Sequence, residues 1–514
     1  MQTSKTFYLS TLLIVFCLLT SYQSLSAKPT TENTVNIHGV FEIPSLDPTR
    51  SGYSFNRMQI LETLVNVDNS GHLTPGLASE WNLLDEGKIW ELTIREGVTF
   101  HDGSPLNNQV IVDNLNLIQT KPSALKKVAI QEIKAIEPNI VRLTLAKPYR
   151  PLGAVLAHHS ASILAPKSID ASGEIISLIG TGPFSVHEVS IPHKLVVKRF
   201  EQYWGQKASI EYASYLTGHR AEARALQARS GQADIVFGID PAAIPTLKRL
   251  PDLTIIRSDL PRTLAIKINS GHPLLQERRI REALSLAIDR KGIATAILKS
   301  PEVATEQLLH PYMNDWYVRR DTVGYNLNQA QKLLTEAGWK KDDKGWLKKE
   351  GKPFELTLIT YADRPELPTI ATAIQDQWKK LGVKLKVSIT NSSAIPAGHK
   401  DGSLEVALIA RNYGYIADPL GVLIKDFGHE RGGDWGSMSW SNPSIQSTLN
   451  DLVKQSDDEQ YHQLAQQVAA AIYTEKPMIP IAYYVQQTVV GKRIAGFTFD
   501  PYERSFHLNK LQWK

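Results

Sequence analysis

The sequence contains almost no cysteine. Cys17 is the single cysteine in a chain of 514 residues, and it lies in an apolar run close to the start. If that run is cleaved off during maturation, the mature protein has no cysteine at all. This excludes disulfide bonds, thiolate metal sites and cysteine nucleophiles together.

Beyond residue 27, the sequence also lacks an apolar run long enough to span a bilayer. Before that point, Lys5 supplies a short basic region and residues 7–20 form an apolar run. This run has the length of the hydrophobic part of a secretory signal, and Ala27 ends a segment suited to cleavage. The residues before Cys17 are too large for a lipoprotein cleavage site. We therefore predict that residues 1–27 are a signal peptide and that the mature protein is exported and soluble.

A large surplus of one charge sign is also absent. The 57 basic and 52 acidic residues leave a formal net charge of +5. Spread over the whole chain, this charge does not favour binding to nucleic acid or to an anionic membrane surface. The chain is 42% hydrophobic and 21% charged, which is typical of globular proteins and excludes wholesale disorder, collagen and coiled coil.

The usual signatures of hydrolases, zinc proteases and nucleotide-binding loops are missing as well. The sequence has no G-x-S-x-G, H-E-x-x-H or G-x-x-x-x-G-K-[ST] motif. His158-His159 is the only adjacent histidine pair. On a strand, two such side chains would point to opposite faces and would not chelate one ion. Nothing in the sequence therefore points to an enzyme.

What is present is a mixture of strand and helix patterns. Residues 90–95, 141–145 and 354–358 alternate apolar and polar side chains, which predicts strands. Residues 276–290 place apolar side chains on one helical face, and a stripe at 330–337 precedes Gly338, a typical helix stop. This mixture predicts an α/β or α+β protein.

Five phrases of the sequence, in the same order, resemble the family 5 solute-binding proteins of bacterial ABC importers, which bind peptides or nickel. Each is weak alone, but together they cover nearly the whole mature chain, and most of their residues suit scaffold roles. The phrases are LTPGLASEW at 73–81 with VTFHDG at 98–103, GTGPF at 180–184 with YWG at 203–205, REALSLAIDR at 281–290, the segment 325–339, and WSNP at 440–443.

The resemblance implies a two-lobed α/β periplasmic binding protein of type II, similar to cluster C, with the ligand in a cleft between the lobes. Lobe I would hold residues 28–268 and 485–514, including an extra subdomain at about 60–175, and lobe II would hold residues 269–484. It also implies a periplasmic monomer that works with the permease and ATPase subunits of an importer. No cofactor is expected, and a metal would be present only as part of the transported ligand.

The segment 411–419 carries the clearest indication of the ligand. In the peptide-binding relatives, an aspartate three residues before the acidic-Pro pair binds the α-ammonium of the peptide. Here that position is Tyr415, whose phenol supplies no countercharge at neutral pH. The spacing R-x-x-G-x-x-x-D-P is instead similar to that of the nickel-binding periplasmic protein. That resemblance implies that Tyr413 lines the cleft and that His429, on a later loop, contacts the metal. If Tyr413 and Tyr415 lie on one strand, both rings face the same side and form an aromatic wall.

The arginines of the nickel protein that hold the chelator's carboxylates are not matched here. The corresponding positions are Asn116 and either His159 or Ser162. Arg411 and Arg431 are the candidates to replace those arginines.

Two ligands therefore remain open, namely a nickel-type metal chelate or metallophore, and a peptide bound without the usual aspartate anchor. An exported hydrolase on the same scaffold is an alternative of a different class. A periplasmic chaperone or sensory partner is another, because the sequence does not separate it from a transport component.

Overall fold

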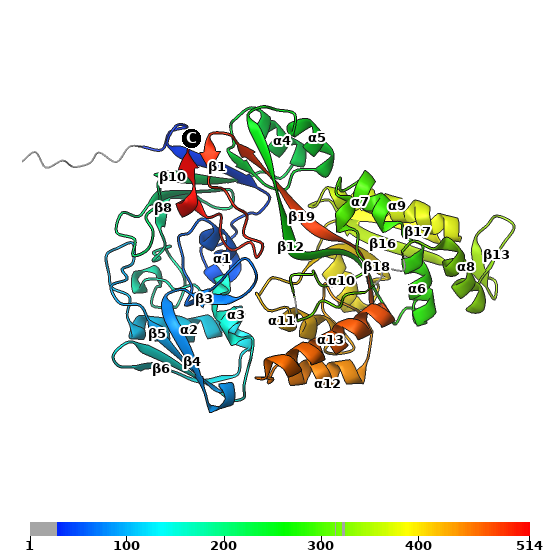
Figure 1. The fold of residues 1–514 in the computed structure, drawn as a ribbon, viewed down its shortest axis with the longest axis horizontal. Helices are drawn as coiled ribbons and strands as arrows, with labels where there is room; N and C mark the ends of the chain where they lie inside the picture. Colours follow the sequence, from blue (N-terminus) through cyan, green and yellow to red (C-terminus); the bar gives the residue numbers. More distant parts are fainter. Residues whose placement is uncertain (1–27, 314, 321–323) are drawn as a thin grey trace, which may run out of the picture.

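The computed structural model describes residues 28–313, 315–320 and 324–514, so the predicted signal peptide lies outside the described residues. Its central feature is a ten-stranded sheet that extends through both lobes (Figure 1). The predicted two-lobed α/β class is confirmed. Across the sheet the strands are β17 (Lys384–Thr390), β16 (Glu355–Tyr361), β18 (Val406–Asn412), β12 (Leu253–Ile268), β19 (Met478–Gly491), β11 (Ile235–Val236), β1 (Thr34–Gly39), β10 (Tyr212–Thr217), β9 (Lys194–Arg199) and β8 (Phe184–Ser190).

The long strands β12 and β19 cross from one lobe to the other (Figure 1). They pair antiparallel, and the pairing is interrupted where Asp259 faces Val485 and Thr263 faces Tyr483. Residues 260–262 of β12 therefore lie opposite a single residue of β19, as in a β-bulge.

Lobe II is the part built around a cluster of buried apolar side chains drawn from residues 264–482. Helix α9 shows why its sequence is helical. It buries apolar side chains at spacings of three and four, from Leu367 to Leu381, and it ends at Gly382 with a φ of 102°. The helices of lobe II are α6 (Arg278–Leu286), α7 (Arg290–Ala296), α8 (Leu327–Glu336), α9 (Glu366–Leu381), α10 (Ala394–Asp401), α11 (Leu420–Phe427), α12 (Pro443–Leu452) and α13 (Asp458–Glu475). A small sheet at its end joins β13 (Lys340–Lys341), β14 (Leu347–Lys349) and β15 (Lys352–Pro353).

The single helix predicted over residues 276–290 is in fact two helices. Helix α6 ends at Leu286, and the side chain of Asp289 accepts a hydrogen bond from the backbone N–H of Gly292 to cap α7. A capping aspartate competes with helix continuation. The apolar face was read correctly, because Ile280, Ala283 and Leu284 are buried.

Lobe I is the remaining described part of the chain. Its helices are α1 (Pro48–Arg57), α2 (Asn108–Thr120), α3 (Leu152–Leu156), α4 (Ala221–Arg229) and α5 (Ile244–Leu247). A separate sheet in this lobe runs in the order β4 (Ala78–Leu84), β5 (Ile89–Ile94), β7 (Ile140–Leu145) and β6 (Ile130–Ile136). Two pairs of short strands complete it, β2 (Val65–Val67) with β3 (Leu73–Pro75), and β20 (Ile494–Ala495) with β21 (Gln512–Trp513). The strands predicted at 90–95, 141–145 and 354–358 correspond to β5, β7 and β16 and are confirmed.

Two of the segments that resemble the family, at 98–103 and 180–184, contact each other and support the scaffold. The backbone N–H of Gly180 donates to Nδ1 of His101 over 3.2 Å, and Nε2 of His101 lies 2.9 Å from the carbonyl oxygen of Gly182. A Cβ atom on Gly180 or Gly182 would lie 2.2 Å from the carbonyl oxygen of Ile60 or Gln59, respectively. Only glycine fits at such an approach.

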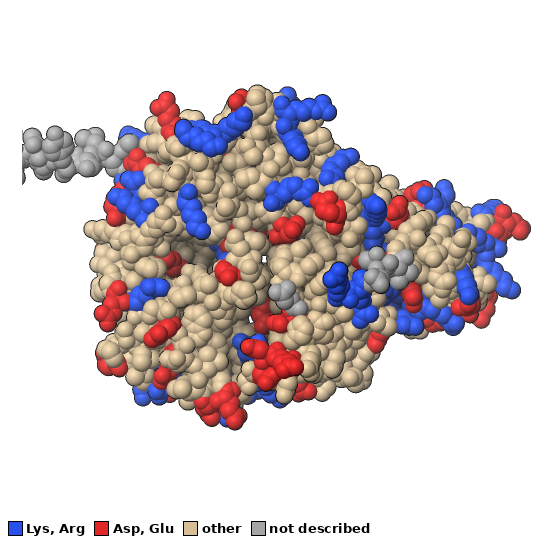
Figure 2. Space-filling view, in the orientation of Figure 1, with Lys and Arg blue, Asp and Glu red and all other residues tan. Residues whose placement is uncertain are grey.

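None of the helices in the described ranges is both long and apolar enough to cross a bilayer. Both basic and acidic side chains occur on the face seen in Figure 2. The predicted domain boundaries, 28–268 with 485–514, 60–175 and 269–484, stay predictions.

Candidate ligand cleft

Two adjoining cavities lie where the lobes meet. The first, of about 370 Å³, is the arginine chamber, and the second, of about 340 Å³, is the histidine chamber. They form one cleft, because six residues line both of them. These are Phe41, Arg57, Arg262, Arg364, Asn412 and Glu503.

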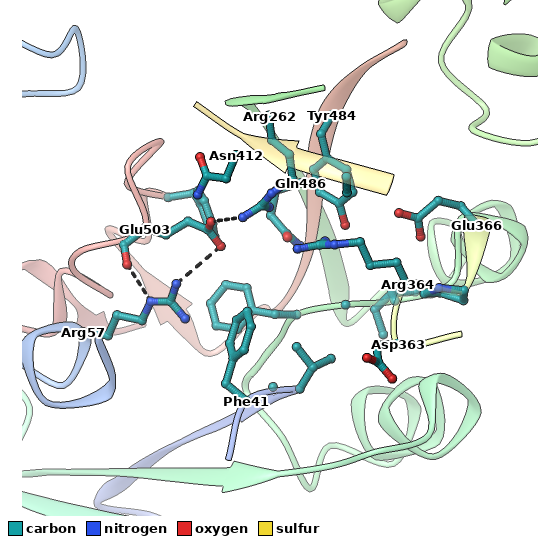
Figure 3. A pocket seen from close by; sticks show the side chains of 18 of the residues that line it. Phe41, Arg57, Arg262, Asp363, Arg364, Glu366, Asn412, Tyr484, Gln486 and Glu503 are labelled. Carbon is teal, nitrogen blue, oxygen red and sulfur yellow. Dashed lines mark hydrogen bonds and ion pairs between the residues drawn. The ribbon is translucent and has the colours of Figure 1, made fainter. Parts of the chain in front are cut away.

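Glu503 holds two guanidinium groups in the wall of the arginine chamber (Figure 3). Its carboxylate lies 3.4 Å from Nη2 of Arg57 and accepts a hydrogen bond from Nη2 of Arg262. The three side chains are only 6–12% exposed. Burial alone would raise the pKa of Glu503, but the charges of Arg262 and Arg57 outweigh it and lower that pKa. Glu503 is therefore ionised.

Arg364 extends into the same chamber from the loop between β16 and α9 (Figure 3). Its guanidinium lies 4.8 Å from the ring centre of Tyr484, and no ion pair to it is found among the described residues. Burial raises the pKa of the nearby Glu366, despite the charge of Arg364. Asp363 also lines the chamber but is exposed. Burial alone would lower the pKa of Arg364, but Tyr484, Glu366 and Glu503 raise it. The wall thus presents a charged guanidinium that makes no ion pair with the described residues and can bind an anion.

The histidine chamber contains a pair of closely packed imidazoles, tilted at 39° to each other, at the start of a short 3-10 helix, η3 (His159–Ala161). The rings of His158 and His159 have centroids 3.9 Å apart, and the ring of Tyr415 lies 4.6 Å from that of His158. The strand assumed for this pair was wrong. In the turn that begins η3, adjacent side chains share one side.

Ser160 fixes the tautomer of His158. Its backbone N–H donates to Nδ1 over 3.2 Å, and its hydroxyl lies 2.8 Å from the same nitrogen. A neutral His158 therefore carries its proton on Nε2. Burial lowers the pKa of His158 to about 3, and burial together with His158 and Arg57 lowers that of His159 well below its usual value. Both rings are neutral near pH 7.

Two buried nitrogens of the pair have no hydrogen-bond partner among the described residues. They are Nε2 of His158 and Nδ1 of His159. A buried polar atom is costly unless it is paired. His158 can therefore offer its Nε2–H to a carboxylate, and His159, whose tautomer is not fixed in this way, can offer an imidazole nitrogen to a metal ion.

Three of the residues predicted from the sequence reach the cleft. Tyr415 and His159 come together in the histidine chamber, and Arg411 lines the arginine chamber. Arg411 is not free, because its Nε and Nη2 each donate to the carboxylate of Asp426 over 2.7 Å.

The expected aromatic wall of Tyr413 and Tyr415 is wrong. Strand β18 ends at Asn412, so neither tyrosine lies on a strand. Tyr413 is 0% exposed, with its hydroxyl 4.0 Å from the sulfur of Met478, whereas Tyr415 is 57% exposed. Tyr413 packs in the core of lobe II and does not share a surface with Tyr415.

The remaining predicted residues lie apart from the cleft. Asn116 is exposed on α2, and His429 and Arg431 are exposed on the loop after α11. None of the three lines the arginine or histidine chamber. Nδ1 of His429 accepts a local hydrogen bond from the backbone N–H of Gly432 over 3.1 Å. Their roles in binding stay predictions.

The sequence analysis missed the residues that give the cleft its charge, Arg57, Arg262, Arg364 and Glu503. No local motif marks them, because Arg57 and Glu503 are 446 positions apart. The adjacent histidines would have indicated the site if a turn, rather than a strand, had been assumed for them.

A third cavity, of about 670 Å³, adjoins the histidine chamber at Ala154, Ala417 and Tyr502. We name it the aromatic chamber. Its aromatic lining consists of Trp81, Trp90, Tyr149, Tyr312, Trp316, Tyr461 and Tyr502, together with His72. The cleft therefore continues beyond the two smaller chambers.

Comparison with known proteins agrees with this geometry. The model of the bacterial extracellular solute-binding proteins, family 5, matches residues 72–433. The chain is 23% identical over 467 residues to the nickel-binding periplasmic protein of Escherichia coli, covering 87% of this chain and 88% of that protein. It is also 23% identical over 495 residues to the dipeptide-binding protein of Escherichia coli, covering 89% and 90% respectively.

Solved structures show the same fold. NikA from Brucella suis in complex with Fe(III)-EDTA superposes with a TM-score of 0.86 at 20% identity, covering 94% of this chain and 100% of that one. The oligopeptide-binding protein AppA from Bacillus subtilis gives a TM-score of 0.78 at 19% identity, covering 94% and 99%. With its lobes enclosing a solute cleft, the chain belongs to the bacterial extracellular solute-binding proteins of family 5.

Proposed function

We propose that this protein is the solute-binding component of an ABC importer and that its cleft captures an anionic metal chelate. The observation that carries the proposal is the guanidinium of Arg364, which makes no ion pair with the described residues and lines the histidine chamber together with two neutral imidazoles. A chelate with carboxylate groups and a metal centre needs both kinds of partner.

The arginines suit the carboxylates of a chelator. Arg364 can bind one carboxylate through two parallel N–H donors. Arg57 and Arg262 share Glu503, so each has further donors to offer. The Brucella NikA structure was solved with Fe(III)-EDTA, a polycarboxylate chelate, and this is the class of compound that a wall of guanidinium groups would bind.

The imidazoles suit the metal side of such a ligand. Both rings stay neutral at pH 7, so His159 can ligate the metal while His158 donates its Nε2–H to a carboxylate of the chelator. Tyr415 covers the pair. In this proposal the metal belongs to the transported ligand, and the protein has no cofactor of its own.

Ligand binding would favour the closed arrangement of the lobes. Arg364 belongs to lobe II, whereas Arg57 and Glu503 belong to lobe I. A ligand that contacts both sides binds the closed state better than the open one, and only this difference in affinity can shift the equilibrium.

A peptide is the second candidate, and the aromatic chamber favours it. Its volume of about 670 Å³ and its aromatic lining would accept side chains. The resemblance to the dipeptide-binding protein supports the same reading. Against it, Glu503 already holds two guanidinium groups, and the position of the family's anchoring aspartate is Tyr415.

We place the protein in the periplasm as a monomer, delivered by the signal peptide predicted at residues 1–27. Its partners would be the permease and ATPase subunits of the importer. These assignments rest on the family and on the sequence of the leader.

Native mass spectrometry with metal analysis, on mature protein purified from the periplasm, tests the proposal. A metal that co-purifies with a small organic acid supports it. A ladder of peptide masses without metal contradicts it and favours the peptide.

Arg364→Met provides a second test, with Fe(III)-EDTA as the probe in calorimetry. We expect affinity to fall about 10- to 100-fold, because a charge-assisted contact is worth about 1.5–3 kcal/mol. Arg249→Met is the matched control, since Arg249 is exposed and lies outside the cleft. Equal affinities of the two variants would contradict the role of Arg364.

A further inference from the structure

Three neighbouring strands of the large sheet bring their ends to one edge of lobe I. Strands β1 and β10 are parallel, with Gly39 opposite Thr217, so both finish at this edge. Strand β9 is antiparallel to β10, with Lys194 opposite Leu216, so β9 begins there. Residues that follow β1 and β10 or precede β9 are therefore close in space.

A metal-binding type of side chain stands at each of these positions. Glu42 follows β1, His219 follows β10, and His193 precedes β9. One ligand atom from each residue lies within 4.8 Å of the other two. Nε2 of His219 lies 3.5 Å from Oε1 of Glu42, and the two imidazole rings meet edge-on at 5.7 Å.

The backbone holds the three segments together. The N–H of Ile43 donates to the carbonyl oxygen of Pro192 over 2.8 Å, and the N–H of Thr217 donates to that of His193 over 2.9 Å. The hydroxyl of Thr217 donates to the carbonyl oxygen of Phe41 over 2.8 Å. The positions of the three Cα atoms are thus fixed by the fold before any ion arrives.

We propose that Glu42, His193 and His219 form a binding site for a divalent transition-metal ion on the outer surface of lobe I. Two imidazoles and one carboxylate suit Zn²⁺, Ni²⁺ or Cu²⁺, whereas Mg²⁺ and Ca²⁺ prefer sites made of oxygen atoms. All three side chains are exposed, so they can turn toward an ion at small cost. Water would fill the remaining coordination positions.

This site is separate from the cleft. None of its three residues is among those that line the arginine, histidine or aromatic chamber. Phe41, the neighbour of Glu42, lines the first two. An ion bound here would tie the loop after β1 to the β8–β9 turn and to the end of β10. The proposal therefore concerns free metal ions and does not depend on what the cleft binds.

Zinc sulfate is the probe, in calorimetry with chelator-free mature protein. To count the surface site alone, the titration is repeated with a His158→Ala/His159→Ala double variant. We expect one equivalent of Zn²⁺ to bind in that variant, with no response to Mg²⁺. His193→Ala and His219→Ala should each weaken this binding at least tenfold, and Glu42→Gln should weaken it less.

His187→Ala is the matched control, because His187 is an exposed histidine on the same hairpin but lies outside the cluster. It should leave the affinity unchanged. Thermal unfolding in the presence of EDTA checks that each variant folds. Absence of binding at micromolar Zn²⁺, or equal binding by wild type and His193→Ala, overturns the proposal. Binding of Fe(III)-EDTA by the His193→Ala variant is measured in parallel, so that failure of the surface site is distinguished from failure of the cleft.

Discussion

The imidazole rings of His158 and His159 lie 3.9 Å apart in a shared wall of the ligand cleft. Each ring has a buried nitrogen without a partner among the described residues. The side chains of these two adjacent residues thus point to the same side, because the chain turns into η3 between them. Under the proposed function, this relationship favours the pair over a single histidine on a loop as the contact for a metal chelate.

Replacing the pair should weaken chelate binding. We expect His158→Ala and His159→Ala each to lower the affinity for Fe(III)-EDTA at least tenfold, about 1.4 kcal/mol, as measured by calorimetry. His429→Ala is the informative comparison, since sequence analysis placed the metal contact there and the structure places His429 outside both chambers. A loss of affinity in His429→Ala alone would restore the loop site.

Glu503→Gln should destabilise the free protein and increase its response to an anionic ligand. The substitution leaves Arg57 and Arg262 without their countercharge, which costs about 3–5 kcal/mol at a buried site. An anionic ligand would compensate, so the rise in melting temperature on adding Fe(III)-EDTA should exceed that of wild type. Glu302→Gln, which breaks an exposed ion pair with Arg257, should change stability by less than about 1 kcal/mol. A smaller ligand response in Glu503→Gln would contradict the charge argument.

Tyr415→Asp tests the peptide alternative. An aspartate here would restore the anchor for the α-ammonium, and we expect tighter binding of dipeptides with a free amino group. N-acetylated dipeptides serve as the matched control ligands, because they lack that charge. If neither gains affinity, the missing anchor is not what keeps peptides out.

Acid should destabilise the protein through His101. Burial lowers the pKa of His101 from 6.5 to about 4. Between these values the unfolded chain binds more protons than the folded one, so the free energy of unfolding falls as the pH drops below 6.5. This one group contributes a loss of about 2 kcal/mol by pH 5.

The test is urea unfolding from pH 7 to pH 4 of wild type and His101→Gln. The variant loses two hydrogen bonds and should be less stable at every pH. The slope of its unfolding free energy against pH should be smaller than that of wild type by the equivalent of up to one bound proton. Parallel curves for the two proteins would show that His101 does not titrate in this range.

The fold was largely predictable, because its determinants are local. Alternating side chains predicted β5 and β7 correctly. The error at 276–290 was also local. The apolar stripe continues through α6 and into α7, and only the cap formed by Asp289 separates the two helices.

The site was less predictable, because its charges come from distant parts of the chain. Arg262 and Glu503 are separated by 241 positions, and no spacing rule joins them. Tyr413 and Arg411 were plausible candidates by residue type, yet one is buried in the core and the other is held by Asp426. Which polar side chain is free, and which already has a partner, depends on packing that a sequence pattern does not contain.

The interruption in the pairing of β12 with β19 has a mechanical consequence. Residues 260–262 lie opposite Tyr484 alone, and both Arg262 and Tyr484 line the arginine chamber. If the lobes of the proposed binding protein turn about this interruption, the hinge and part of the chamber wall are the same few residues. A ligand carboxylate bound to Arg262 would then act directly on the hinge, and the angle between the lobes would depend on occupancy.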